Sequence, residues 1–281
     1  AELRYSWRMS ASVDFLTPSH LLPVVVDRER RFGGVARLYG KTGAERIAQA
    51  HAVVFGIGGV GSWAVETLAR TGIGRLTLID MDHVAESNIN RQIHAGDASL
   101  GQAKILAMQQ RIAGYHPDCR VDLIDDFVTA DNWEQLVPQD ATAVIDACDQ
   151  MGAKTAMAAW ARRNKVLFVS VGAAGGKQQG HLVELDDLSR ATHDPLLAQL
   201  RYRLRKQHGA PRDGKSIGVS CVFSREAVQM PVGDACAVDG TVDGSLNCAG
   251  YGSAVAVTAT FGMCAAGWIL KKIAEGLPKP R

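Results

Sequence analysis

A glycine-rich turn near residue 60 carries the first chemical signal in the sequence. Gly56, Gly58 and Gly61 have the spacing of a turn that joins a buried strand to a helix and receives a nucleotide. Gly59 adds a fourth glycine to the same turn. With so few side chains, backbone N–H groups and the N-terminus of the next helix can approach phosphate oxygens closely. The turn predicts a phosphate site, but it does not choose between nucleotides.

Two carboxylates follow the next predicted strand. Asp80 ends the apolar run of residues 76–79, at about the distance from the turn where an acid accepts a hydrogen bond from a ribose hydroxyl. Asp82 places a second carboxylate within reach of the same site. We expect both to belong to the nucleotide site.

Polar and basic residues come next, in an order that a nicotinamide enzyme does not require. Asn88 and Arg91 lie soon after the acids, and Lys104 begins a predicted helix. Charge builds on the α-phosphate of ATP in the transition state of attack at that phosphate, and a bidentate Arg and a Lys can hold it. We expect Arg91 and Lys104 to be catalytic, and Asn88 to hold a phosphate or the leaving group. The order favours ATP used to activate a carboxylate over NAD used to move a hydride.

A further acid follows the predicted strand of residues 143–147. Asp149 lies just beyond the carboxyl end of this strand, where ligands of parallel sheets collect. We expect it to act in catalysis by binding an Mg²⁺ ion that bridges the phosphates. Asp146 is an alternative metal ligand, and a helix-capping role is the structural alternative for Asp149.

Alternating periodicity indicates the fold that would position these groups. Strands are expected at 53–55, 76–79, 120–126, 143–147 and 166–171, with helices at 62–70, 104–113 and 155–163. This alternation predicts an α/β fold, a Rossmann-like doubly wound and mainly parallel sheet with helices on both faces. The second half, from about residue 180, is less regular, and residues 224–247 are expected to form a loop.

Composition narrows the function classes. The chain has 281 residues and a net charge of +2, so bulk charge does not announce a nucleic-acid partner, and the basic run 201–215 is either a solvated helix face or a local contact for RNA. No two of the six cysteines form a CxxC pair, which argues against a structural zinc site and suits a reducing cytoplasm. The apolar run 254–270 could be scored as a membrane span, but we expect a buried helix at a subunit interface and no obligatory membrane association.

The motifs together resemble a known superfamily. The runs GIGGVG at 56–61, DMD at 80–82 and SNINRQ at 87–92, with Lys104 and Cys148-Asp149, are similar to the ATP site of the adenylating superfamily, which includes the ubiquitin-activating enzymes and the bacterial molybdopterin and thiamine sulfur-carrier activators. Further runs, at 31–40, 70–74, 90–94, 218–224 and 257–262, resemble the family of tRNA threonylcarbamoyladenosine dehydratases.

The resemblance implies a specific reaction. Such an AMP-forming, ligase-type enzyme adenylates the threonine carboxylate of a modified adenosine next to the tRNA anticodon. A urea nitrogen of the same modification then expels AMP, giving a cyclic hydantoin with loss of water. By position, Gly58 and Asp80 would hold the adenosine side, Ser87 to Arg91 and Lys104 the phosphates, and Asp149 the metal. The implied cofactors are ATP and Mg²⁺.

The resemblance also implies an assembly. Residues 31–281 would form one adenylating domain after an extension of residues 1–30, and the enzyme would be a cytoplasmic homodimer acting on tRNA. An Arg of one subunit reaches the ATP of the other in this superfamily, and Arg37 is the candidate here. The resemblance further suggests a partner from a sulfur-acceptor or cysteine-desulfurase system.

Other functions remain open at this stage. The main alternative is an adenylyltransferase that activates the C-terminal Gly-Gly of a ubiquitin-like sulfur carrier. A non-catalytic nucleotide-binding module is a third reading, and an NAD oxidoreductase is a distant fourth. The zinc-binding cysteine pairs of the sulfur-carrier activators are missing from this sequence.

Overall fold

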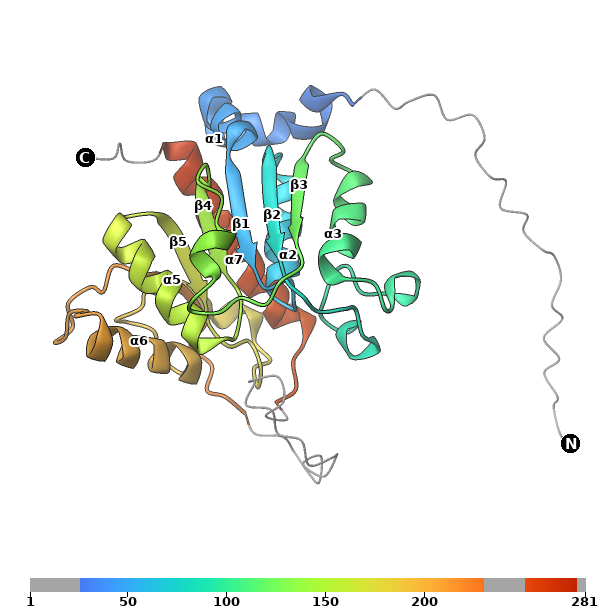
Figure 1. Ribbon diagram of the computed structural model, residues 1–281. Helices are drawn as coiled ribbons and strands as arrows, with labels where there is room; N and C mark the ends of the chain where they lie inside the picture. Colours follow the sequence, from blue (N-terminus) through green and yellow to red (C-terminus); the bar gives the residue numbers. More distant parts are fainter. Residues whose placement is uncertain (1–25, 230–250, 277–281) are drawn as a thin grey trace, which may run out of the picture.

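The computed structural model describes residues 26–229 and 251–276, which form a seven-stranded sheet between layers of helices (Figure 1). The strand order is β3-β2-β1-β4-β5-β7-β6, and only the β6–β7 pair is antiparallel. The predicted doubly wound, mainly parallel sheet is confirmed. The strands are β1 His51–Phe55, β2 Arg75–Ile79, β3 Arg120–Ile124, β4 Ala143–Asp146, β5 Leu167–Val171, β6 Val183–Asp187 and β7 Ser220–Ser224.

Helices cover both faces of the sheet because alternate strand residues are apolar on both sides. Val54 and Leu78 pack into a core with α2, α3 and α7, whereas Val53 and Phe55 pack into a second core with α5 and α6. The helices are α1 Arg28–Gln49, α2 Gly61–Arg70, α3 Lys104–Ala113, α4 Trp133–Leu136, α5 Met151–Asn164, α6 Pro195–Gln207 and α7 Val255–Glu275, with short 3₁₀ helices at Glu86–Asn88, Asp97–Ser99 and Gly180–Leu182.

The apolar run near the C-terminus forms α7, which packs against α2 and the sheet. Phe261, Ala265 and Ile269 are fully buried on its inner face. Gly262 allows the close crossing with α2, since a β-carbon there would overlap the carbonyl oxygen of Val60. None of the helices in the described ranges is both long enough and apolar enough to cross a bilayer. The expected subunit interface on α7 stays a prediction.

The second half of the chain supplies β6, α6, β7 and α7. Asp194 caps α6 by accepting a hydrogen bond from the Leu197 N–H, and Pro195 fits the first turn because its missing N–H would have no partner there. Ser224 ends β7, and most of the predicted loop 224–247 lies outside the described residues.

A buried ion pair joins β4, β5 and α5 just behind the carboxyl edge of the sheet. The Nζ atom of Lys154 lies 2.7 Å from Oδ2 of Asp146, and both side chains are fully buried. Lys154 also donates to Oγ of Ser170 and to the carbonyl of Val171. Burial by itself lowers the pKa of Lys154, but the Asp146 charge outweighs it and the net direction is upward. The pair therefore stays ionised inside the fold.

Removing one partner of this pair should be costly. Lys154→Met leaves the Asp146 carboxylate buried without its counter-charge, and the free energy of unfolding in urea is expected to fall by about 3–5 kcal/mol. Asp146→Asn added to Lys154→Met should recover much of the loss. A single variant as stable as the wild type would contradict this account of the core.

Candidate functional site

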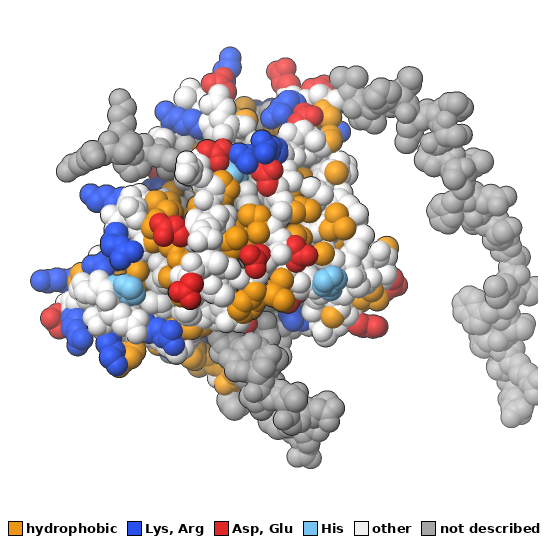
Figure 2. Space-filling model, viewed as in Figure 1, with side chains coloured by type: hydrophobic (Ala, Val, Ile, Leu, Met, Phe, Trp, Pro, Cys, Tyr) orange, Lys and Arg blue, Asp and Glu red, His pale blue; other side chains and the backbone are white. Residues whose placement is uncertain are grey.

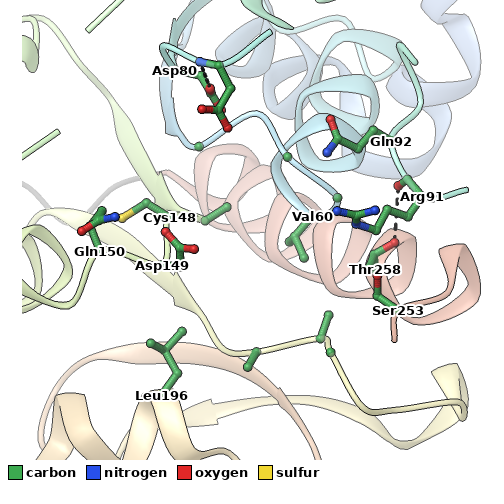
Figure 3. A pocket seen from close by; sticks show the side chains of 18 of the residues that line it. Val60, Asp80, Arg91, Gln92, Cys148, Asp149, Gln150, Leu196, Ser253 and Thr258 are labelled. Carbon is green, nitrogen blue, oxygen red and sulfur yellow. Dashed lines mark hydrogen bonds between the residues drawn. The ribbon is translucent and has the colours of Figure 1, made fainter. Parts of the chain in front are cut away.

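A cavity of about 560 Å³ opens at the carboxyl edge of the sheet (Figure 3). Its lining comes from the segments that follow β1, β2, β4 and β5, together with the start of α6 and residues near the start of α7. The strand order reverses between β1 and β4, and this is the point at which doubly wound sheets bind ligands. The fold therefore brings the predicted residues of separate strands to one site.

The glycine turn forms one wall of this cavity. Gly56 has φ of 83°, and a β-carbon there would lie 2.8 Å from the carbonyl oxygen of Ala147, so both conformation and space require glycine. Gly58 and Gly59 line the cavity. Gly61 does not line it, but a β-carbon at Gly61 would overlap the Gly56 carbonyl, so this residue fixes the shape of the turn.

Asp80 holds the turn through its backbone. Its carboxylate accepts hydrogen bonds from the N–H groups of Ile57 at 2.6 Å and Asp82 at 2.8 Å (Figure 3 shows the second). Burial raises the pKa of Asp80, and the nearby Lys104 charge and these two donors oppose the rise only in part. The carboxylate lines the cavity and stands beside the glycine turn.

Asp82 and Lys104 form an ion pair at the same edge. Lys104 Nζ lies 2.6 Å from Oδ2 of Asp82, and the Lys104 N–H donates to the Asp82 carbonyl at 2.9 Å. The lysine side chain is 8% exposed and the aspartate side chain 64%. A largely buried ammonium group is thus oriented by an exposed carboxylate, and both residues line the cavity.

Arg91 enters the cavity from the segment after β2. Its Nη1 donates to the Ser87 carbonyl at 2.5 Å and to Oδ1 of Asn90 at 3.0 Å. The indole N–H of Trp63 donates to the Arg91 carbonyl and anchors the backbone. Burial lowers the pKa of Arg91, yet a guanidinium remains charged at neutral pH.

The neighbouring polar residues take different positions. Asn88 is buried, lines the cavity and accepts a hydrogen bond from the Ala85 N–H at 3.1 Å. The Ser87 side chain receives a long hydrogen bond from Asn88 Nδ2, and Ser87 is not among the lining residues. The main chain of Ser87, through its bond with Arg91, is closer to the site chemistry than its hydroxyl.

Asp149 and Asp146 separate cleanly. Asp149 lines the cavity, and in Figure 3 it lies on the side opposite Arg91. Helix α5 has Gln150 at its N-cap and no capping side chain, so Asp149 does not cap it. Asp146 faces Lys154 and Ser170 inside the protein and does not line the cavity, which removes the alternative metal ligand. Within the described ranges, no group of three or more His, Cys, Asp or Glu side chains could hold a metal.

Arg37 is not brought to this cavity. It is exposed on α1, and α1 leads directly into the amino end of β1, whereas the cavity lies at the carboxyl ends (Figure 1). Nothing in its own chain therefore places Arg37 against the other candidate residues.

Several lining residues were missed from the sequence. Met81 and Phe127 are large apolar side chains, each about half exposed, that follow β2 and β3. Their positions just after strands were a usable signal. Leu196 and Thr258 reach the cavity from α6 and α7, and no local pattern marks them.

Comparison with known proteins identifies the family. The model of the ThiF family matches residues 33–280. The chain is 48% identical to the tRNA threonylcarbamoyladenosine dehydratase of Escherichia coli, over 87% of this chain and 93% of that protein, and 40% identical to the Haemophilus influenzae dehydratase, over 87% and 94%. The crystal structure of the E. coli tRNA N6-threonylcarbamoyladenosine dehydratase in complex with ATP has a TM-score of 0.79 at 45% identity, covering 89% of this chain and 97% of that one.

The same dehydratase in complex with AMP also has a TM-score of 0.79, at 45% identity and with 90% of this chain covered. Similarity therefore extends over the strands, the glycine turn and both halves of the sheet. This chain belongs to the ThiF family.

Proposed function

We propose that this protein catalyses the ATP-dependent dehydration of threonylcarbamoyladenosine in tRNA to its cyclic hydantoin form. The observation that carries the proposal is the cavity at the carboxyl edge of the sheet, where Arg91, Lys104 and Asp149 surround the glycine turn. The 48% identity to a dehydratase over nearly its whole length, and the ATP and AMP complexes of that relative, support the assignment.

ATP would lie across the switch point of the sheet. The N–H groups of the glycine turn and the start of α2 would face its phosphates, and Asp80 would accept from the ribose. Met81 and Phe127 provide apolar surface on which the flat adenine ring would stack. Asp82 would orient Lys104 toward the phosphates through their ion pair.

The first step forms an acyl-adenylate. A threonine carboxylate oxygen of the substrate attacks the α-phosphorus, the bond from that phosphorus to the bridging oxygen breaks, and pyrophosphate leaves. Arg91 and Lys104 hold the charge that builds on the α-phosphate oxygens. Because both cations are already positioned by protein hydrogen bonds, little reorganisation accompanies the step.

The second step closes the ring. A ureido nitrogen attacks the activated carbonyl carbon, the bond from carbon to the phosphate oxygen breaks, and AMP leaves with that oxygen while the nitrogen loses its proton. The attacking nucleophile belongs to the substrate, so no enzyme nucleophile is needed. Cys148, which lines the cavity, is unsuited to that role because burial raises the pKa of its thiol.

The donor set fits magnesium bound with the nucleotide. Mg²⁺ usually takes one or two carboxylates together with substrate phosphates, and Asp149 supplies one such carboxylate across the cavity from Arg91. When bound, the ion would neutralise phosphate charge. We also infer that the protein acts as a cytoplasmic homodimer, in which Arg37 would serve the site of the other subunit. Docking of a sulfur-system protein is a further proposal.

The reaction is tested by nucleoside mass. Purified protein incubated with ATP and tRNA carrying threonylcarbamoyladenosine should release AMP and yield a nucleoside lighter by one water, seen by mass spectrometry of the digested tRNA. An unchanged nucleoside mass would overturn the proposal, and AMP release that required a small carrier protein would favour sulfur-carrier activation instead.

The two cations should act mainly in the transition state. Arg91→Ala and Lys104→Ala are each expected to lower kcat by about 10²–10³-fold with a smaller change in KM for ATP. Steady-state kinetics at saturating tRNA measures this, with Lys271→Ala, an exposed cation on α7, as the matched control. Near-normal kcat in both variants would show that the site is wrongly assigned.

Asp149 should matter through the metal. Asp149→Asn is expected to raise the Mg²⁺ concentration for half-maximal activity at least about tenfold and to reduce the gain in ATP affinity that Mg²⁺ provides. Asp126→Asn is the control, since Asp126 is a carboxylate of the same cavity that follows β3. Equal Mg²⁺ dependence in the two variants would exclude this role for Asp149.

A further inference from the structure

A strongly basic surface covers the ends of α5 and α6, away from the cavity. Residues 195–215 contain six Lys or Arg and one acid, Asp213, and α5 ends with further cations. Figure 2 shows Lys and Arg side chains gathered on this side of the molecule. We call this surface the basic face and define it by six residues: Arg163, Lys165, Arg203, Lys206, Arg212 and Lys215.

Backbone hydrogen bonds hold the two helix ends together. Arg162, at the end of α5, donates to the carbonyls of His208 and Gly209 just after α6, at 3.0 and 3.3 Å. Arg205 donates to the Pro211 carbonyl at 3.1 Å. Because these arginines contact carbonyls rather than carboxylates, they order the surface without neutralising their own charge.

The charge of the basic face is not compensated by the acids around it. Among the ion pairs of the described residues, none involves the six side chains that define the face, and the nearby Arg190 and Arg225 pair with Asp186 and Glu184 instead. A protein with a net charge of +2 thus concentrates unpaired cations on one side.

An exposed aromatic ring lies among these cations. Tyr202 is 61% exposed on the outward side of α6, while Leu200 and Leu204 are buried on its inner side. Lys206, one turn later, has its Nζ atom 5.6 Å from the Tyr202 ring centroid. Cations beside an accessible ring are the combination that binds phosphodiester chains and stacks on their bases.

Helix α6 connects the cavity to the basic face. Pro195 and Leu196 line the cavity at its first turn, and Lys206 follows ten residues later near its end. At ~1.5 Å per residue the two points are roughly 15 Å apart along the axis. That length matches about four to five stacked nucleotides at ~3.4 Å each, so a strand with one base in the cavity would reach the basic face.

We propose that the basic face binds the phosphodiester backbone of the tRNA that flanks the modified adenosine, with Tyr202 packing against the nucleic acid. The inference rests on the proposed function and adds the surface that holds the substrate. The phosphate contacts would supply affinity and orientation, while the cavity would select the modified nucleoside.

The test compares two charge-reversal variants of the full chain. Arg203→Glu/Lys206→Glu alters the basic face, and Arg120→Glu/Lys271→Glu reverses two exposed cations at the start of β3 and near the end of α7. For the first variant, the Kd for threonylcarbamoylated tRNA should rise at least about tenfold at ~0.1 M salt. The slope of log Kd against log salt concentration should fall by about two, since each lost phosphate contact removes ~0.9.

The controls separate binding from folding and from chemistry. The Kd for ATP and the thermal unfolding midpoint should match the wild type in both variants, and the second variant should keep its tRNA affinity. Unchanged tRNA affinity and salt slope in the first variant would overturn the basic face while leaving the proposed function intact, provided that the wild type still removes water from the tRNA.

Two other outcomes are also decisive. If the wild type leaves the nucleoside mass unchanged, the proposed function fails independently of the face. If the first variant loses affinity for vesicles containing about one-third anionic lipid but not for tRNA, the surface serves a membrane and the proposal is wrong.

Discussion

Close backbone contact at the glycine turn is the constraint on which the site depends. The Gly56 carbonyl lies against Gly61, and Gly56 itself lies against the carbonyl end of β4. These contacts place the start of α2 directly above β1 and leave its first N–H groups facing the cavity. Any side chain at these positions would separate α2 from β4, and the segments that carry Asp80 and Asp149 would no longer share one cavity.

The cavity is also electrostatically prepared before a ligand arrives. Lys104 is held by Asp82, and Arg91 is held by the Ser87 carbonyl and Asn90. The ion pair of Asp146 and Lys154 lies behind the cavity and fixes the strand ends that carry the neighbouring loops. Fixed cations over a rigid base are what stabilisation of phosphate charge requires, because their orientation does not change during the reaction.

Sequence patterns predicted the parallel sheet and the residues that immediately follow its strands. Each of these strands is a short apolar run, and the carboxyl ends of parallel strands necessarily meet, so Asp80 and Asp149 could be placed at one edge. Lys104 was found because it begins a helix after a polar segment. The same reasoning could not separate Asp146 from Asp149, because three residues decide between the interior and the cavity and only the Lys154 contact shows which is which.

Contributions from distant elements could not be predicted. Leu196 and Thr258 reach the cavity through the packing of α6 and α7, which depends on tertiary contacts and not on local pattern. The place of Arg37 on α1 depends on the connection into β1. The proposed role of this residue in a second subunit is a question of assembly, on which periodicity within one chain has no bearing.

The contact of Gly262 with the turn gives α7 a mechanical role. One side of this helix touches the carbonyl of Val60, the last residue before α2, and Thr258, one turn earlier, lines the cavity. Helix α7 also packs against α1 and β5, so it spans the molecule from the phosphate turn to the opposite edge of the sheet. Displacement of α7 would move the turn with it, and nucleotide occupancy is therefore coupled to whatever packs on the outer side of this helix.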